Sequence, residues 1–202
     1  SDVYKRQTEY LPVSSTGHLI LTSALLGLDG APIDTFNIVI QGGAILAVLG
    51  LYRVRVLGMA QGLIGQNPEG RRLLVRLLIA FAPAAILGPL LDDTIEATLF
   101  QPVPVLAALG IGGVIMLKLG KGRADPSDTD PADLPLRAAL LIGLAQCIAM
   151  WPGTSRSMVT LAAGVALGLR PARAAEFSFL LGLPTLGGAC VYKLVKEGDT
   201  VL

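Results

Sequence analysis

The chain has 202 residues, of which 52% are hydrophobic and 15% are charged, and its mean hydropathy is +0.65. Soluble domains carry about 25% charged residues, so this composition excludes an ordinary soluble domain and indicates a membrane protein. The 16 Lys and Arg against 15 Asp and Glu leave a net charge of +1, which excludes a basic surface that would attract nucleic acid. Cys147 and Cys190 lie in apolar runs, and we expect neither a disulfide nor a metal site from them.

The chain begins with SDVYKRQ, residues 1–7, which has no initiator Met, no apolar core and no periodicity. This segment looks foreign to the rest of the chain and is neither a signal peptide nor a membrane span. The chain ends at Leu202, soon after an apolar run. We therefore expect both ends to be truncated, with residues 8–202 forming a single membrane-embedded domain.

A dense polar cluster lies in the segment TEYLPVSSTGHLI. It contains Glu9, Ser14, Ser15, Thr16 and His18, which is the only histidine in the sequence. Hydroxyl groups can act as nucleophiles or bind phosphate, and a nearby His or Glu can act as a base. The alternative is helix capping alone, because Ser or Thr before an apolar run is a normal N-cap.

Six apolar windows approach the length that a membrane helix needs, which is about 20 mostly apolar residues. Four are uninterrupted, at 35–52, 73–91, 102–119 and 176–194, and two are broken by polar residues, Pro and Gly, at 18–28 and 136–169. Broken helices at membrane depth usually mark a site, since protein or water must satisfy their backbone. The expected fold class is all-α: a polytopic membrane protein with about four full transmembrane helices and two re-entrant helical hairpins. Glu176, at the start of the last window, is expected to cap it.

A second polar cluster, WPGTSRS at 151–157, interrupts the later broken window. An arginine at membrane depth costs about 2.5 to 3.5 kcal/mol, so Arg156 is expected to bind an anion. Its guanidinium suits phosphate, and hydroxyls of Thr154, Ser155 and Ser157 lie beside it near the start of the next helix. The alternative is an arginine whose side chain extends to the membrane interface.

Charge near the helix ends predicts a topology, because Lys and Arg concentrate on the cytoplasmic side. Arginines bracket the loop within 53–76, whereas the loops 28–34 and 92–101 have neither Lys nor Arg. The broken window would then enter and leave on the cytoplasmic side. A shift of 141 positions also aligns Ser14 with Ser155, a weak internal repeat that would place the two halves in opposite orientations.

TEYLPVSSTGH at 8–18 and PGTSRS at 152–157 resemble the two signature motifs of the undecaprenyl-diphosphate phosphatase family, also called bacitracin resistance proteins. The similarity extends through TFNIVIQGGAILAV and AAEFSFLLGLPTLGGA. It implies an inverted-topology repeat, with a first repeat at about 8–91, a linking span and loop at 102–135, and a second repeat from about 136.

The resemblance also implies roles for individual residues. The catalytic residues would be Glu9, Ser15, His18 and Arg156, and the substrate-binding residues Ser14, Thr16, Thr154, Ser155 and Ser157. Glu9 matches the second acid of a Glu-x-x-x-Glu pair and would hold a divalent cation, Mg²⁺ or Ca²⁺. The chain departs from the family pattern at Lys5, where the partner glutamate is expected, and at Met158, where a small residue is usual. Lys5 puts cation binding in doubt.

The function implied is hydrolysis of undecaprenyl pyrophosphate to undecaprenyl phosphate and phosphate, in recycling of the cell-wall lipid carrier and in bacitracin resistance. The attacking group stays open between Ser15, His18 and water. A transporter or flippase of phosphorylated polyprenyl lipid is the alternative, since it would share the broken helices and the anion-binding arginine. The expected partners are the polyprenyl pyrophosphate and membrane lipid, without nucleic acid, and a homo-oligomer is compatible with the sequence. The expected location is the bacterial inner membrane, with the site opening to the periplasmic side.

Overall fold

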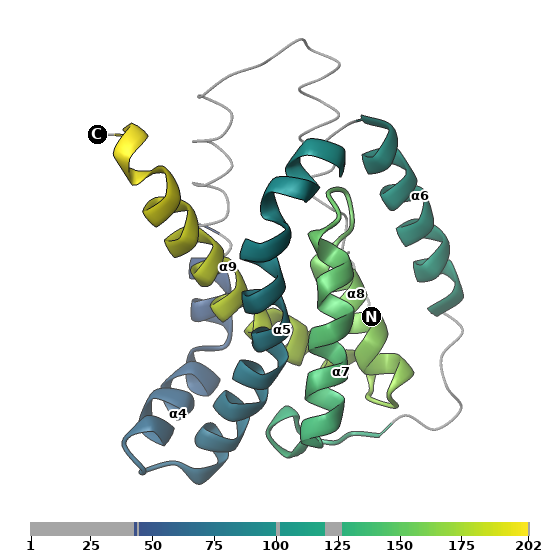
Figure 1. The fold of residues 1–202 in the computed structure, drawn as a ribbon. Coiled ribbons are helices and arrows are strands. Elements are labelled where there is room, and N and C mark those ends of the chain that lie inside the picture. Colours follow the sequence, from purple (N-terminus) through teal and green to yellow (C-terminus); the bar gives the residue numbers. More distant parts are fainter. Residues whose placement is uncertain (1–42, 44, 100–101, 120–126, 202) are drawn as a thin grey trace.

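The computed structural model describes residues 43, 45–99, 102–119 and 127–201 (Figure 1). In chain order the elements are α4 (Arg53–Leu63), α5 (Pro68–Leu99), α6 (Pro102–Leu119), the 3₁₀ helix η1 (Pro131–Asp133), α7 (Leu136–Gln146), the 3₁₀ helix η2 (Cys147–Met150), α8 (Arg156–Ala166) and α9 (Pro171–Val201). The expected all-α class is confirmed for this part of the chain.

Three of the four uninterrupted apolar windows are helical. Window 73–91 lies within α5, window 102–119 coincides with α6, and window 176–194 lies within α9. Window 35–52 is only partly described, and the broken window 18–28 lies outside the described residues.

One described helix, Pro68–Leu91 within α5, is long and apolar enough to cross a membrane. A second candidate is the pair Ile45–Leu51 and Arg53–Leu63, which bends by 87° and could form one broken span. Only 17% of the apolar stretch of Pro68–Leu91 is buried, whereas the core helix of a soluble protein is mostly buried. Leu78, Ile86 and Leu90 accordingly point outward from α5, as expected for a lipid-facing helix.

The α4–α5 turn is tight because glycines let the two backbones touch. Gly65 has a φ of +78°, a conformation that only glycine adopts at little cost. A Cβ added at Gly70 would lie 1.9 Å from the carbonyl oxygen of Gly58, so no larger residue fits. The side-chain oxygen of Asn67 accepts the N–H of Gly70 at 2.9 Å and caps the first turn of α5.

Helix α5 lies at the centre of the described core and contacts α4, α7 and α9 (Figure 1). The fully buried core side chains include Leu73, Leu77 and Ala80 of α5, Ala139 and Ile142 of α7, and Phe177, Leu180 and Leu181 of α9. Where α5 crosses α7, a Cβ at Gly143 would lie 2.2 Å from the carbonyl oxygen of Ala80. The small residues of the apolar windows therefore serve close helix packing, as such residues do in membranes.

The broken window 136–169 folds into a hairpin: α7 runs in, η2 and a short loop form the tip, and α8 returns. The segment that precedes the hairpin is bonded to its far end: Ser127 donates its N–H to the Gly168 carbonyl at 2.8 Å and accepts the N–H of Arg170 at 2.9 Å. Helices α7 and α8 have 11 residues each, or about 16 Å, which is about half of a 30 Å hydrocarbon core. The hairpin geometry matches the sequence expectation for this window.

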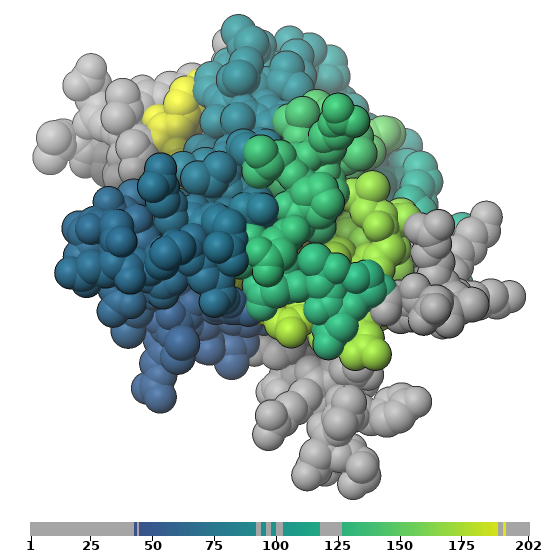
Figure 2. Space-filling model, turned by 90° about the horizontal axis from the view of Figure 1, so that it is seen from below, coloured from purple at the N-terminus to yellow at the C-terminus, as the bar shows by residue number. Residues whose placement is uncertain are grey.

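Ion pairs join the elements at the end of the molecule where the hairpin begins. Arg55 of α4 pairs with Glu69 of α5 at 2.6 Å, with Glu176 of α9 at 2.8 Å, and with Asp130 beside η1. Figure 2 views this end, with the α4–α5 turn in blue beside the start of α7 in green. The expectation that Glu176 caps the last window is wrong, because α9 begins five residues earlier, at Pro171, and the carboxylate pairs with Arg55 instead.

Burial raises the pKa of Asp130, but the hydrogen bonds from the Ala132 N–H and the Arg55 guanidinium outweigh it and hold that pKa below its ordinary value. Arg173 adds a second cation to the same carboxylate at 3.6 Å. Asp130 is therefore an ionised junction between α4, η1 and α9.

Candidate functional site

The second polar cluster, WPGTSRS, forms the tip of the α7–α8 hairpin and the first turn of α8. Gly153 has a φ of +91°, and a Cβ there would lie 2.7 Å from the Val105 carbonyl oxygen of α6. The Trp151 indole N–H donates to the Pro104 carbonyl at 3.1 Å. The Pro-Gly turn is thus needed because the tip packs directly on the start of α6.

Ser155 is the N-cap of α8. Its Oγ accepts the N–H of Met158 at 3.3 Å and lies 3.2 Å from the Oγ of Ser157. The Thr154 N–H donates to the Trp151 carbonyl at 3.0 Å, which closes the turn before the cap. The structure therefore brings the hydroxyls of Ser155 and Ser157 together at a helix N-terminus, where the dipole favours an anion.

Arg156 is the first residue of α8, and its guanidinium lies against α9. A Cβ added at Gly182 would lie 2.8 Å from Nη2, so this glycine makes room for the guanidinium. Nη1 is buried, and it has no hydrogen-bond partner among the described residues. A buried charged donor without a partner is costly, which favours an anionic ligand at this place.

A buried contact fixes α8 on α9 below this arginine. The Thr160 and Ser178 hydroxyls lie 2.5 Å apart, and the Thr160 hydroxyl also reaches the Arg156 carbonyl at 2.9 Å. Both residues are about 1% exposed. This pair holds the first turn of α8 in register with α9 and so positions the arginine.

Gln146, the last residue of α7, is a polar residue of this site that the sequence reasoning missed. It is 2% exposed, and its Nε2 has no hydrogen-bond partner among the described residues. The Thr185 hydroxyl lies 3.3 Å from Oε1, one helical turn along α9 from Gly182. The amide of Gln146 stands out within the apolar stretch 136–150 of the sequence. The residues that surround it in the folded structure cannot be read from the sequence.

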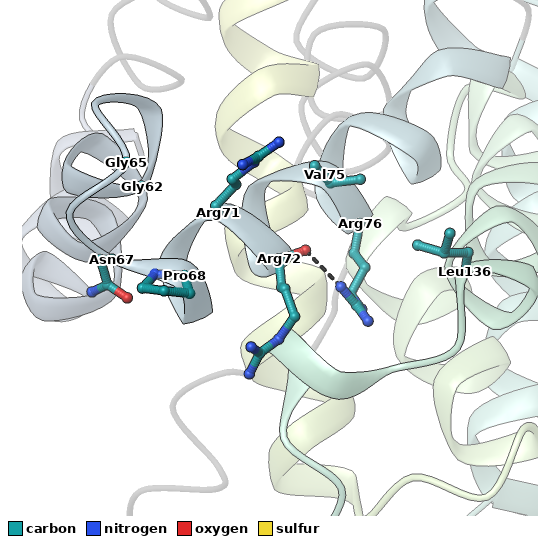
Figure 3. Close-up of a pocket in the computed structure, with 9 residues that line it drawn as sticks. All are labelled: Gly62, Gly65, Asn67, Pro68, Arg71, Arg72, Val75, Arg76 and Leu136. Atoms are coloured by element: carbon teal, nitrogen blue, oxygen red, sulfur yellow. Dashed lines mark hydrogen bonds between the residues drawn. The ribbon is translucent and has the colours of Figure 1, made fainter.

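A pocket of about 480 Å³ lies away from the hairpin tip, between the α4–α5 turn and the start of α7 (Figure 3). Two of the arginines that line it have structural partners: Arg76 donates to the Leu134 carbonyl at 2.5 Å, and Arg72 pairs with Asp133 at 3.1 Å. These bonds attach α5 to the segment before α7. The hydroxyl cluster and Arg156 do not line this pocket, so we do not place the site there.

A family model described as "Bacitracin resistance protein BacA" matches residues 7–201. The chain belongs to the BacA family. It is 48% identical over 198 residues to an "Undecaprenyl-diphosphatase" of Sorangium cellulosum, covering 96% of this chain and 64% of that relative. Identity is 46% to the protein of the same name from Ectopseudomonas mendocina, covering 95% of this chain and 69% of the relative. It is 47% to an "Undecaprenyl-diphosphatase 1" of Chromobacterium violaceum, covering 96% and 72%. The chain thus spans about two thirds of the length of these relatives.

The first BacA cluster, with Glu9, Ser14, Ser15, Thr16 and His18, lies outside the described residues. Its meeting with the hairpin tip therefore stays a prediction. Within residues 43, 45–99, 102–119 and 127–201, no group of three His, Cys, Asp or Glu side chains could hold a metal ion. The described part of this BacA chain places Arg156 and the hydroxyls of Ser155 and Ser157 together at the hairpin tip.

Proposed function

We propose that this chain carries the site of a membrane phosphatase that converts undecaprenyl pyrophosphate to undecaprenyl phosphate and phosphate. The observation that carries the proposal is the buried, unpartnered Nη1 of Arg156 at the tip of an apolar hairpin. A guanidinium in such a place fits a pyrophosphate, because it binds two phosphate oxygens at once and stays charged when buried. Relatives named for this activity at 46 to 48% identity support the same substrate class.

Phosphoryl transfer depends mainly on positioning and on neutralising charge on the phosphoryl oxygens. Arg156, with the hydroxyls of Ser155 and Ser157, would hold the pyrophosphate at the start of α8. Ser15 or a water would attack the terminal phosphorus, with His18 as the base toward this nucleophile or as the acid toward the leaving phosphate. Mg²⁺ or Ca²⁺ at Glu9 would supply further charge neutralisation when bound, but every role given to residues 8–18 belongs to the proposal.

The membrane arrangement is part of this proposal. The α7–α8 hairpin would be re-entrant, since the start of α7 lies beside the α4–α5 turn, the start of α9 that follows the hairpin is paired with α4, and each arm is about half a bilayer long. The positive-inside rule would put that end in the cytoplasm and direct the tip toward the outer face of the inner membrane. About four full spans, a second hairpin at 18–28 and an inverted repeat complete the expected architecture.

Arg156→Ala tests the function. We expect it to lower phosphate release from undecaprenyl pyrophosphate at least about a hundredfold, because a charge-assisted bond contributes about 1.5 to 3 kcal/mol and the transition state uses two of them. Arg156→Lys should also be poor, since the planar fork is lost. Arg137→Ala is the matched control, because this exposed arginine lies at the base of the same hairpin.

Phosphate release is measured on purified protein in detergent, with and without chelator. Full turnover by Arg156→Ala would remove this arginine from the mechanism. If the wild-type protein instead moves a labelled polyprenyl pyrophosphate across a vesicle membrane without releasing phosphate, the flippase alternative is correct.

A further inference from the structure

Two buried side-chain atoms lack a hydrogen-bond partner among the described residues: Nη1 of Arg156 and Nε2 of Gln146. They come from different helices, at the end of α7 and the start of α8, on either side of the hairpin tip. Both side chains lie against one stretch of α9. Arg156 lies beside Gly182, and Gln146 contacts Thr185, three residues further on and hence on the same helix face.

Unpaired buried polar groups are rare in folded proteins, because each costs about 1 to 3 kcal/mol. A structural glutamine would satisfy its amide within the core. Among the described residues the Gln146 amide has the Thr185 hydroxyl alone, at 3.3 Å, and that hydroxyl has a single proton, which it also directs to the Leu181 carbonyl at the shorter distance of 2.7 Å. If the amide rotates by 180°, its nitrogen donates to Thr185 and its oxygen is left unpaired instead. Either orientation leaves part of the amide free for a ligand.

Resting on the proposed function, we propose that Gln146 is a further substrate-binding residue, whose amide N–H donates to a phosphate oxygen of the pyrophosphate held by Arg156. The two donors face the same α9 stretch, Gly182 leaves space beside the guanidinium, and no described carboxylate is bonded to either of them. A bound pyrophosphate selects the amide orientation with nitrogen toward it.

The variant Gln146→Leu keeps the side-chain size and removes the amide. We expect kcat/KM for undecaprenyl pyrophosphate to fall about tenfold to a hundredfold, the loss typical of one hydrogen bond to a charged group. The midpoint of thermal unfolding without substrate should stay the same or rise, since an unpaired polar group is replaced by an apolar one. Gln146→Glu should lose more activity than Gln146→Leu, because a carboxylate repels the pyrophosphate.

Asn67→Ala is the structural control. Asn67 caps the first turn of α5, outside the hairpin tip, so its loss should lower stability and leave the kcat/KM of the folded protein nearly unchanged. A Gln146→Leu variant that loses stability and keeps its kcat/KM would overturn the inference and make Gln146 a core residue.

A prenyl methylene-diphosphonate, which keeps the charge of pyrophosphate and resists hydrolysis, separates this inference from the proposed function. Weaker binding of this probe by Gln146→Leu than by wild type supports the inference even if the wild type shows no turnover. Equal binding by both proteins overturns it, and normal wild-type hydrolysis would still leave the proposed function standing.

Discussion

At the scale of single residues, the site depends on one glycine opposite one arginine. Gly182 has no role that its sequence neighbourhood reveals, because LLGLPTLGGA is a run of small and apolar residues. In the structure Gly182 does have a role: because it lacks a side chain, the Arg156 guanidinium has room to lie against α9 at this position. The position of the Arg156 guanidinium is thus set from α9, 26 positions away in sequence.

Gly182→Ala should impair function more than stability. The added Cβ would lie 2.8 Å from Nη2, and the flexible end of the arginine can move away at little cost in folding free energy. We expect at least about a tenfold loss of kcat/KM, since displacing a binding group by a fraction of an ångström disturbs transition-state contacts. Gly187→Ala on the same helix has nothing within 4 Å of its Cβ and should retain activity. Similar kinetics in both variants would contradict the assigned role of Gly182.

Capping and ligand binding at Ser155 do not exclude each other. Its Oγ accepts one backbone N–H, and a hydroxyl has a second lone pair and one proton to offer. The helix start that it caps is the element end whose dipole favours phosphate. For Ser155 the capping contact is present in the structure, and the ligand role stays a prediction.

At the scale of elements, the hairpin depends on a very close crossing of α5 and α7. Gly143 brings the α7 backbone against the Ala80 carbonyl of α5, and both residues are buried. This contact lies three residues before Gln146, so it also fixes where the end of α7, which carries Gln146, lies along α5.

Gly143→Ala should destabilise the protein. Alanine normally favours a helix over glycine by about 0.5 to 1 kcal/mol. Here the Cβ would meet backbone at 2.2 Å, so α5 and α7 must separate, and overpacking of this kind costs about 1 to 3 kcal/mol. Gly110→Ala in α6, with nothing within 4 Å, is the control. The midpoint of thermal unfolding in detergent should drop for Gly143→Ala and not for the control. An unchanged midpoint would show that the crossing is looser than described.

At the scale of the whole molecule, the ion pairs of Arg55 and Arg173 hold four elements together at one end. They link α4, α5, the segment at η1 and α9 through Glu69, Asp130 and Glu176. Sequence separations of up to 121 residues are bridged in this way. This end anchors the base of the hairpin whose tip carries the site.

The stability of this end should depend on acid pH through Asp130. Its pKa is held below the ordinary value of 3.8, so the unfolded chain takes up a proton before the folded one does. The contribution is fully present above pH 3.8 and is lost as the pH falls through the lower pKa of the folded protein. Asp130→Asn should lower the unfolding midpoint at pH 6 and flatten its decline as the pH falls below 3.8. A decline as steep in Asp130→Asn as in the wild type would contradict the assignment.

The sequence by itself determined the class, the family and the second cluster. Its low charge and long apolar windows require helices in lipid, since only helices satisfy every backbone group locally there. The Pro-Gly pair in PGTSRS predicted an interruption of 136–169, because proline removes a backbone donor and glycine favours turns, although Pro83, Pro89 and Pro184 lie inside α5 and α9. An arginine between apolar segments implied a ligand for the same local reason.

Only the tertiary structure decided which residues surround Arg156 and which charges pair. Gln146 and Gly182 are ordinary in sequence and become part of the site through the packing of α7 and α8 on α9. Glu176 suggested a helix cap because it stands at the start of an apolar window, which the neighbouring residues alone reveal. Its actual partner, Arg55, lies in a different helix and is not visible from those neighbours. Local chemistry is encoded in neighbouring residues, but the partners of a buried or charged group come from helices far apart in the chain.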